Sequence, residues 1–546
     1  RGDGEMSNIV LTGFMGTGKS VVGREVASTL GRKFVDMDEE IEARAGKSIL
    51  EIFAQDGEAA FREMEAALCL ELGGEGLHPG PVEGLVIATG GGALVNPANR
   101  ALMMQSGTVI CLSCSTDEIL QRLEGTANSD RPLLDVADPR AEIEGLLEVR
   151  RRAYEAIPWQ IDTTGLSVEE VVAQVERIAA VVTLSVRYPG GQYDIHLGSG
   201  LLAHVGGAMR AAGIPRDTRV ALVSNPYVAP LFGAEVEGSL REAGFEPFRC
   251  SVPDGEEHKT INTVAELYSQ FLKGKLDRSG SVLALGGGVT GDVAGFAAAT
   301  FMRGVHFVQV PTTLLAMVDA SVGGKTGVDL PQGKNLVGAF KQPVLVLVDP
   351  SMLATLPEAE IRCGLAEIIK HSILGDPGLF AELEANAGAL SSWQGQEAVT
   401  RIARALRVKI QIVEGDPYEG GRRAVLNLGH TVGHALEKLG GYSMSHGQAV
   451  SIGMVAAARL AAQLGMAKPA LARRIESVLS AWGLPVECPP FEPDAIYAAM
   501  AHDKKTRGSQ LRWVLPIAIG QVEIVSDVPA DLIKSVLKSL GARSLS

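Results

Sequence analysis

The sequence predicts an α/β protein in three consecutive parts: a parallel sheet with helices and a phosphate-binding loop (1–180), an α/β dinucleotide-binding domain (181–355) and an α-helical metal-binding domain (356–546). Three observations support this. Apolar runs alternate with helix-length stretches through most of the first 350 residues, which is typical of parallel sheets. Two glycine-rich loops directly follow apolar runs. After residue 350, strand patterns give way to successive helical ones.

Composition narrows the classes of function. The chain has 50 basic and 64 acidic residues, a formal net charge of −14, and no Lys/Arg-rich block, which disfavours a nucleic-acid partner. Even the apolar stretch AVSIGMVAAARLAA is broken by Arg459, so no run reaches the roughly 18 residues of a membrane span. The opening RGDGEMSNIV lacks an apolar signal core, and six scattered cysteines form no disulfide framework. We therefore expect a soluble, cytoplasmic protein.

The first part contains four expected strands, each followed by a helix-length segment: NIVLT (8–12), FVDMD (34–38), LVIAT (85–89) and TVICLS (108–113). This alternation predicts a parallel sheet. Cys111 and Cys114 lie at the fourth run, where we expect buried thiols, because no second CxxC completes a metal or redox site.

The pattern changes near residue 180. A helix is expected to end near Ala180, and two alternating strands with a Pro-Gly-Gly turn at 189–191 follow. A second α/β series then has strands RVALVS, PFRCSV, SVLALGGG, HFVQVP and PVLVLVDP. Residues from about 358 to 500 are expected to form helices, and LRWVLPIAIGQVEIV a hairpin.

The segment LTGFMGTGKS follows the first expected strand and precedes a helix. It matches the pattern GxxxxGK followed by Ser or Thr, in which backbone N–H groups and the helix N-terminus surround phosphate oxygens. Lys19 is expected to neutralise the β/γ-phosphate charge and Ser20 to coordinate Mg²⁺. The predicted ATP-binding residues of this loop are Gly13, Gly16, Thr17, Gly18, Lys19 and Ser20.

Asp36 and Asp38 alternate with apolar residues at the end of the second expected strand. Both can then leave the same strand end, where parallel sheets bind ligands. One carboxylate could support the metal and the other a substrate hydroxyl. The alternative is that they only cap the following helix.

Several motifs of the first part together resemble shikimate kinase: residues 34–65, then ATGGG, RPLL and RRRAYEAIPWQIDTT, within about residues 7–178. The resemblance implies that shikimate is held by Asp38, Arg62, Gly90, Gly91, Gly92 and Arg150. It places Arg131 of the DRPLL motif over the transferring phosphoryl group and Asp36 beside the Mg²⁺ site. It also implies that Lys19, Asp38 and Arg131 are catalytic. Planar guanidinium groups suit a carboxylate substrate.

The second glycine loop, Gly286-x-Gly288-x-x-Gly291, has the dinucleotide-binding spacing between an apolar strand and a helix. This motif alone also fits a packing turn. Two further polar loops, VPDGEEHK (252–259) and VPTTLLAMVDASVGGKTGVD (310–329), follow other strands and should face the same cleft.

Three histidines cluster near residue 440. His430 and His434 are spaced i,i+4 and share a helix face, and His446 follows. Imidazoles with a carboxylate and one open position are typical of catalytic zinc, and spacing alone favours the His430/His434 pair. Any one of them could instead be a satisfied core histidine. Asn427, one turn earlier, is a candidate hydroxyl-binding neighbour.

With GLAEIIKH, GGKTGVD, GKNLVGAF, TFMRG and HDKK, the chain from about 183 to 540 resembles 3-dehydroquinate synthase. The resemblance implies Zn²⁺ ligands Glu367, His430 and His446, and moves His434 to the substrate phosphate region. It implies an NAD site of Glu256, Lys259, Gly287, Gly288, Asp292, Thr312, Thr313, Asp319, Lys325, Lys334 and Thr355. Substrate and catalytic residues would be Lys325, Lys370, Lys409, Arg423, Asn427 and His434, with Lys504 or Lys505 on the phosphate and Arg303 from a second subunit. Asn225 stands where the family often has an acidic residue for the adenine ribose, so that contact is not carried over.

The two resemblances imply a bifunctional enzyme of small-molecule substrates, with ATP, Mg²⁺, NAD and Zn²⁺ or Co²⁺, and a homodimer through the second half. Two alternatives stay open. The second half could be a polyol dehydrogenase that consumes NAD⁺, and the first half a nucleotide-sensing module without catalysis.

Overall fold

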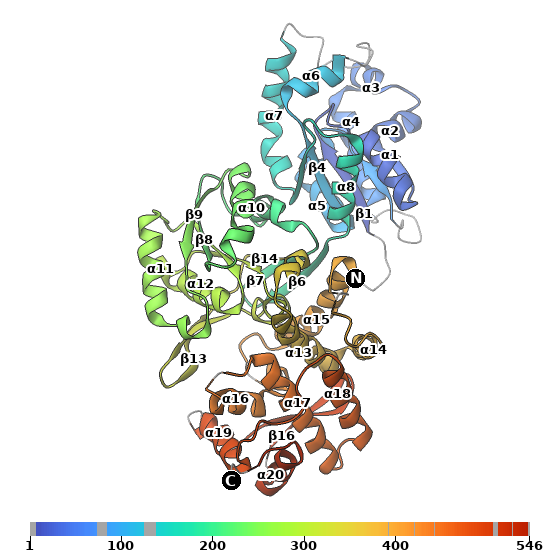
Figure 1. The fold of residues 1–546 in the computed structure, drawn as a ribbon. Coiled ribbons are helices and arrows are strands. Elements are labelled where there is room, and N and C mark those ends of the chain that lie inside the picture. The colour runs from blue at the N-terminus through green and yellow to red at the C-terminus, as the bar shows by residue number, and fades with distance from the viewer. Residues whose placement is uncertain are drawn as a thin grey trace. The chain divides into compact units, whose positions relative to one another are not determined.

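The computed structural model describes residues 7–73, 84–124, 138–390, 393–419, 421–441, 443–505, 511–526 and 528–543 (Figure 1). By its internal contacts the chain divides into two compact units. Unit 1 comprises Arg1–Val181, Ala203–Asp217 and Gly238–Phe245, and unit 2 comprises Val182–Leu202, Thr218–Glu237 and Glu246–Ser546. No helix within the described residues is both long and apolar enough to cross a membrane.

Unit 1 contains a five-stranded sheet in the order β2-β3-β1-β4-β5, with every pair parallel. Its strands are β1 (Asn8–Gly13), β2 (Phe34–Asp36), β3 (Val86–Ala88), β4 (Gly107–Ser113) and β5 (Trp159–Asp162). All six residues of the central β1 are buried, because neighbours lie on both edges and helices cover the faces. The four expected strands and their parallel arrangement are confirmed.

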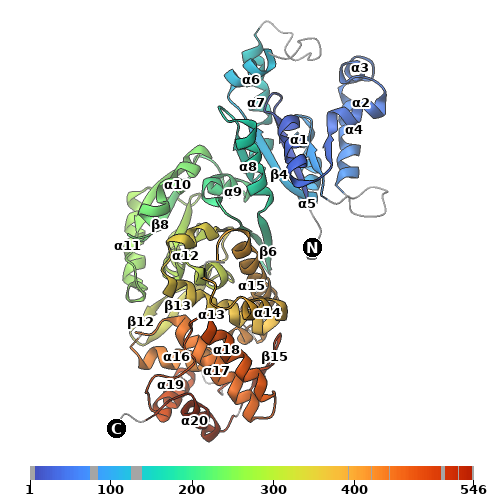
Figure 2. The ribbon, with the colours of Figure 1, turned by 45° about the vertical axis from the view of Figure 1, so that its right-hand side comes forward.

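The helices of unit 1 are α1 (Lys19–Leu30), α2 (Met37–Ala45), α3 (Ile49–Gln55), α4 (Gly57–Leu72), α5 (Pro97–Ser106), α6 (Thr116–Glu124), α7 (Pro139–Glu155), α8 (Val168–Ala179) and α9 (Val205–Ala211). Helices α1 and α8 lie side by side against the sheet (Figures 1 and 2). Ser48 and Ser167 each form a capping box at a helix N-terminus, which satisfies otherwise unpaired amides.

Unit 2 contains a seven-stranded sheet in the order β6-β7-β14-β11-β10-β8-β9. Its strands are β6 (Val182–Tyr188), β7 (Gly191–Leu197), β8 (Arg219–Ser224), β9 (Glu246–Ser251), β10 (Ser281–Gly286), β11 (His306–Pro311) and β14 (Leu345–Val348). Only β6 and β7 pair antiparallel. The associated helices are α10 (Ala229–Glu242), α11 (Ile261–Lys273) and α12 (Gly288–Thr300), which begins at the second glycine loop. This is the α/β arrangement that the sequence predicts.

The glycine-rich segments GGKTGVD and GKNLVGAF suggest loops around Lys325 and Lys334, and here the structure differs. Residues 325–340 form an antiparallel hairpin of β12 (Lys325–Leu330) and β13 (Gly333–Phe340). Val328 opposite Val337 supplies an apolar cross-strand pair, and the intervening Pro331 favours the turn. Lys325 and Lys334 therefore lie on strands and not in loops.

The remainder of unit 2 is mainly helical: α13 (Glu358–Gly375), α14 (Pro377–Ala385), α15 (Gly395–Gly415), α16 (His430–Leu439), α17 (His446–Gln463), α18 (Pro469–Ala481), α19 (Pro493–Lys505) and α20 (Ala530–Ser539). Helix α17 packs against α13 and α16 and is buried along most of its length. Strands β15 (Trp513–Ala518) and β16 (Gln521–Val525) form the expected hairpin. The helical part is thus confirmed.

Candidate active sites

The first glycine loop connects β1 to α1. Gly13, Gly16 and Gly18 have φ values of 134°, 78° and 92°, a region that residues with a side chain rarely adopt. A Cβ on Gly13 would also overlap the carbonyl of Leu112 in β4. The loop therefore requires glycine, and its position at the N-terminus of α1 suits an anion.

The side chains of Lys19 and Thr17 hydrogen-bond to the backbone of the same glycine loop. Lys19 Nζ and Thr17 Oγ1 each donate a hydrogen bond of 2.8 Å to the carbonyl oxygen of Phe14. Ser20 follows in the first turn of α1 and is partly exposed. The predicted phosphate and Mg²⁺ residues are thus together at one helix N-terminus.

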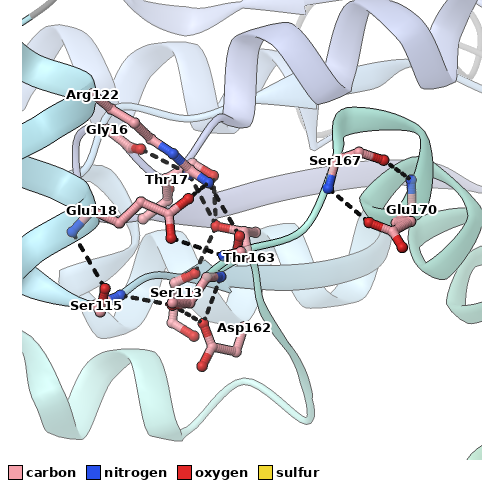
Figure 3. Close-up of polar contacts among 12 residues, drawn as sticks. Gly16, Thr17, Ser113, Ser115, Glu118, Arg122, Asp162, Thr163, Ser167 and Glu170 are labelled. Atoms are coloured by element: carbon pink, nitrogen blue, oxygen red, sulfur yellow. Dashed lines mark hydrogen bonds and ion pairs between the residues drawn. The ribbon is translucent and has the colours of Figure 1, made fainter.

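The side chain of Arg122 of α6 hydrogen-bonds to the glycine loop (Figure 3). No motif in the sequence predicted this residue. Its Nη1 donates to the carbonyl of Gly16 at 3.2 Å and to Thr163 Oγ1 at 3.1 Å, while Nη2 donates to the Thr163 carbonyl at 3.1 Å. Thr163 in turn donates to the carbonyl of Ser113 at 3.0 Å. Thr163 directly follows β5, so the rule that ligand sites gather at strand ends could have indicated it.

Asp36 and Asp38 do not alternate along one strand. Strand β2 ends at Asp36, whose Oδ1 accepts a 3.1 Å hydrogen bond from the Asp38 amide and so caps α2, and Asp38 lies in the first turn of that helix. Asp36 is therefore the N-cap residue of α2. Burial and the neighbouring Asp36 raise the pKa of Asp38, against the lowering effect of Lys19 and Arg62.

The Gly90-Gly91-Gly92 segment leaves space for charged side chains. A Cβ on Gly90 would lie 2.7 Å from both Asp38 Oδ1 and Glu65 Oε1, and a Cβ on Gly92 would overlap the guanidinium of Arg62. The missing side chains therefore let Asp38, Glu65 and Arg62 meet at the end of β3.

Arg150 joins this cluster from α7. Its Nη1 donates to the Gly91 carbonyl at 3.3 Å, as does the Tyr154 hydroxyl at 2.7 Å. The guanidinium lies 5.4 Å from the ring centroid of Phe14 in the glycine loop. The structure therefore brings together all the residues that are predicted to hold shikimate. Arg131 lies outside the described residues.

Glu65 is a further member of this cluster that sequence reasoning missed. Its side chain is 1% exposed and Oε2 accepts from Arg62 Nη1 at 2.6 Å. Burial raises its pKa. The i,i+3 spacing to Arg62 on α4 was the available signal.

In unit 2, Glu367 of α13 faces His430 of α16 and His446 of α17. Glu367 Oε1 lies 3.8 Å from His430 Nε2 and 3.6 Å from His446 Nε2, and the glutamate is completely buried. Two donors bound tetrahedrally at about 2.1 Å from one Zn²⁺ are about 3.4 Å apart. Glu367 Oε2 also forms an ion pair with Lys370 of the same helix. The three residues therefore fit a divalent metal of the zinc type.

His434 lies close to this group, with its ring centroid 5.2 Å from that of His430 and 6.3 Å from that of His446. One ring nitrogen from each of the three histidines falls within a 4.8 Å cluster. The exposed His434 is the outermost of them. His430 and His434 share one face of α16, as predicted. Glu367 and His446 lie beside His430.

A buried ionic cluster adjoins Glu367. Asp319, in the π-helical turn Ala316–Ala320, accepts a hydrogen bond from Lys409 Nζ at 2.6 Å, and its Oδ1 lies 3.8 Å from His371 Nε2. Lys409 lowers the pKa of Asp319 although burial opposes it, and burial with Lys370 lowers the pKa of His371 to about 3. Several charged side chains therefore lie next to Glu367 in the interior of unit 2.

Several residues predicted to hold the dinucleotide lie close to one another. Gly287 caps α12, and Asp292 on this helix pairs with Lys259 at 2.6 Å. Lys334 of β13 lies 3.3 Å from Glu256. A Cβ on Gly287 would lie 3.1 Å from Thr313, which follows β11. Gly288 begins α12, and Thr312 donates its amide to the Gly286 carbonyl at 3.0 Å.

Other predicted residues lie as follows. Arg423 is buried and donates to the carbonyls of Pro417 and Gly323, Asn427 is exposed, and Lys325 pairs with Glu419 at 2.8 Å. Thr355 donates a hydrogen bond within its own 3₁₀ turn, to the Met352 carbonyl.

Arg303 is exposed. Lys504 and Lys505 lie in α19, and their side chains are outside the described residues. Asn225 caps the start of α10 and donates to Asp254 at 2.7 Å.

Comparison with known proteins covers both units. Residues 15–179 match the family model of shikimate kinase, 249–363 that of the 3-dehydroquinate synthase N-terminal domain and 364–506 that of its C-terminal domain. The 3-dehydroquinate synthase of Microcystis aeruginosa is 45% identical over 359 residues, 65% of this chain and 98% of that protein. That of a Synechococcus species is 49% identical over 351 residues, 64% and 95% of the two chains.

One solved structure is similar to this chain over most of its own length. The 2-epi-5-epi-valiolone synthase of Streptomyces hygroscopicus, solved with NAD⁺ and Zn²⁺ bound, is 32% identical and has a TM-score of 0.60, covering 64% of this chain and 96% of that one. Both matched families are families of enzymes. The chain therefore belongs to the 3-dehydroquinate synthase family and carries, ahead of that part, a shikimate kinase domain.

Proposed function

We propose that the chain catalyses two reactions. One transfers a phosphoryl group from ATP to the 3-hydroxyl of shikimate. The other converts 3-deoxy-D-arabino-heptulosonate 7-phosphate to 3-dehydroquinate and phosphate. The observation that carries the proposal is that each unit has its own charged pocket: the glycine loop beside Asp38 and Arg62, and the buried Glu367 facing two imidazoles. We propose domain limits of 1–180, 181–355 and 356–546.

In the kinase pocket, positioning and charge do most of the work. The loop amides and Lys19 hold the phosphates of ATP, and Ser20 provides a hydroxyl for Mg²⁺. Asp38 orients the substrate hydroxyl, its raised pKa suiting it to share a proton with that group. Arg62 and Arg150 hold the carboxylate of shikimate through planar donor pairs.

In the synthase pocket, Glu367, His430 and His446 would hold Zn²⁺ or Co²⁺, and the loops around Gly287, Asp292 and Lys259 would hold NAD. A metal bound there would supply a Lewis acid for a substrate hydroxyl, and bound NAD⁺ would supply reversible hydride transfer. Lys370, Lys409 and Arg423 bind the anionic substrate from a buried position, which strengthens each charge interaction. Lys504 or Lys505 would hold its phosphate.

We also propose a homodimer in which Arg303 of one protomer reaches the substrate of its partner. Arg303 and Met302 are exposed and have φ values of 68° and 49°, an uncommon conformation for residues with side chains. The proposed location is the cytoplasm, which the six free cysteines support. The partners are small molecules.

One assay of the full chain tests both activities. Purified protein should form shikimate 3-phosphate from ATP only when shikimate is present, and should release phosphate from the heptulosonate phosphate only when NAD⁺ and a divalent metal are present. ATP hydrolysis that does not respond to shikimate would reject the kinase assignment. NADH accumulation without phosphate release would favour a polyol dehydrogenase.

A further inference from the structure

Glu437 of α16 contacts the proposed metal site without belonging to the predicted set. Its Oε2 lies 3.6 Å from His446 Nδ1, while Nε2 of the same ring lies 3.6 Å from Glu367 Oε1. Two buried carboxylates therefore flank the imidazole on opposite nitrogens. Glu437 is only 5% exposed, although the next residue of the same helix, Lys438, is exposed.

The two carboxylates cannot have the same role. A metal-bound histidine uses one ring nitrogen for the metal and keeps its proton on the other, and a carboxylate that accepts this proton fixes the tautomer and the ring orientation. Nε2 of His446 points to the Glu367 oxygen that also faces His430, so Nε2 is the metal-facing atom. Nδ1 is then the protonated atom, and Glu437 is its nearest carboxylate acceptor.

The charge of Glu437 is compensated from another element. Lys334 Nζ of β13 lies 3.6 Å from Glu437 Oε1 and 3.3 Å from Glu256 Oε1. The lysine can therefore offset the cost of burying the carboxylate without occupying the oxygen that faces His446. It also joins α16 to the cleft proposed for NAD.

We propose that Glu437 is a positioning residue for the metal site, holding His446 in the tautomer that presents Nε2 to the metal. This inference rests on the proposed metal-dependent function. Loss of such an outer carboxylate lowers metal affinity by about 10- to 100-fold in comparable sites. A side chain that only formed an ion pair with Lys334 would have no such effect.

The test uses the full chain with Co²⁺ alone as the probe, in competition with a chromophoric chelator. Glu437→Gln should weaken Co²⁺ binding about 10- to 100-fold and alter the visible absorption of the bound ion, and Glu437→Asp should recover part of the affinity. Glu384→Gln is the matched control, because Glu384 forms an exposed ion pair with Arg474 in the same unit. Shikimate phosphorylation should persist in every variant, which shows that unit 1 is intact, and the melting temperature of the metal-free protein reports the folding of unit 2.

Two results would overturn the inference in distinguishable ways. Wild-type affinity and spectrum in Glu437→Gln, with a lowered melting temperature of the metal-free protein, would reduce Glu437 to a structural partner of Lys334. Failure of the wild-type chain to bind one Co²⁺ would remove the proposed metal-dependent function together with this role.

Discussion

His446 Nε2 and Glu367 Oε1 lie 3.6 Å apart, although the two residues belong to different helices, α17 and α13. Both helices are buried over most of their length, so the packing of the helical part fixes this distance. A metal at this point would be held by rigid elements, which favours the precise geometry that catalysis requires.

Replacing His446 with alanine should separate the two activities. The change removes one of three proposed ligands, so metal content and phosphate release from the heptulosonate phosphate should fall to background. Shikimate phosphorylation should stay near wild type, because the kinase pocket lies in the other unit. His258→Ala, at a partly exposed histidine, is the control for metal content. Parallel loss of both activities in a folded variant would contradict the division into two pockets.

Lys19→Ala should have the opposite effect. Loss of a cation at the transferring phosphoryl group should lower kinase turnover by about 10²-fold or more, with synthase activity unchanged. The comparison is Lys33→Ala, an exposed lysine in the same unit. ATP-dependent phosphorylation of shikimate near the wild-type rate would reject the loop assignment.

Gly92→Ala should weaken shikimate binding. The added Cβ would overlap the guanidinium of Arg62 and displace it, so the KM for shikimate should rise about tenfold, equivalent to about 1.4 kcal/mol. Gly145→Ala, in an exposed helical position with open space around it, should leave KM unchanged and slightly raise stability. An unchanged KM in Gly92→Ala would show that Arg62 does not hold the substrate.

His196 should make the protein sensitive to acid. It is buried on β7, with Nδ1 3.0 Å from Thr183 Oγ1, and burial lowers its pKa from 6.5 to about 4. Above pH 6.5 the ring is neutral in both the folded and unfolded states, so it adds no pH dependence. Between pH 6.5 and 4 only the unfolded state binds the proton, so stability falls by up to about 1.4 kcal/mol per pH unit.

Melting temperatures measured across this pH range test the effect of His196. His196→Gln should show a shallower decline than wild type, whereas His258→Gln, at a partly exposed position, should follow wild type. Equal slopes for wild type and His196→Gln would contradict the assignment.

Apolar runs and residue spacings predicted much of the fold, because they show which positions of a single strand or helix are buried. The strands beginning at Asn8 and Ser281, with the glycine loops that follow them, were identifiable from apolar runs and spacing. The pair His430 and His434 was identifiable because a helix places them on one face. The hairpin containing Lys334 was not, because glycine and polar residues obscure its alternation.

The residues that were missed depend on contacts between distant segments. Glu65 and Glu437 each have the spacing of a solvated helix position, and only packing against other elements buries them. Arg122 holds the phosphate loop through a carbonyl oxygen, a contact that leaves no sequence signature. Asp38 was found for its polarity at a strand end, but it lies in a helix because Asp36 caps α2 there.

The most direct measurement of the central claim is phosphate release from 3-deoxy-D-arabino-heptulosonate 7-phosphate by the full chain, with NAD⁺ present at far below the substrate concentration. If the second pocket returns the hydride within each cycle, many phosphate molecules should form per NAD⁺ and no NADH should accumulate. NADH formation that matches substrate consumption, with no phosphate released, would contradict the account.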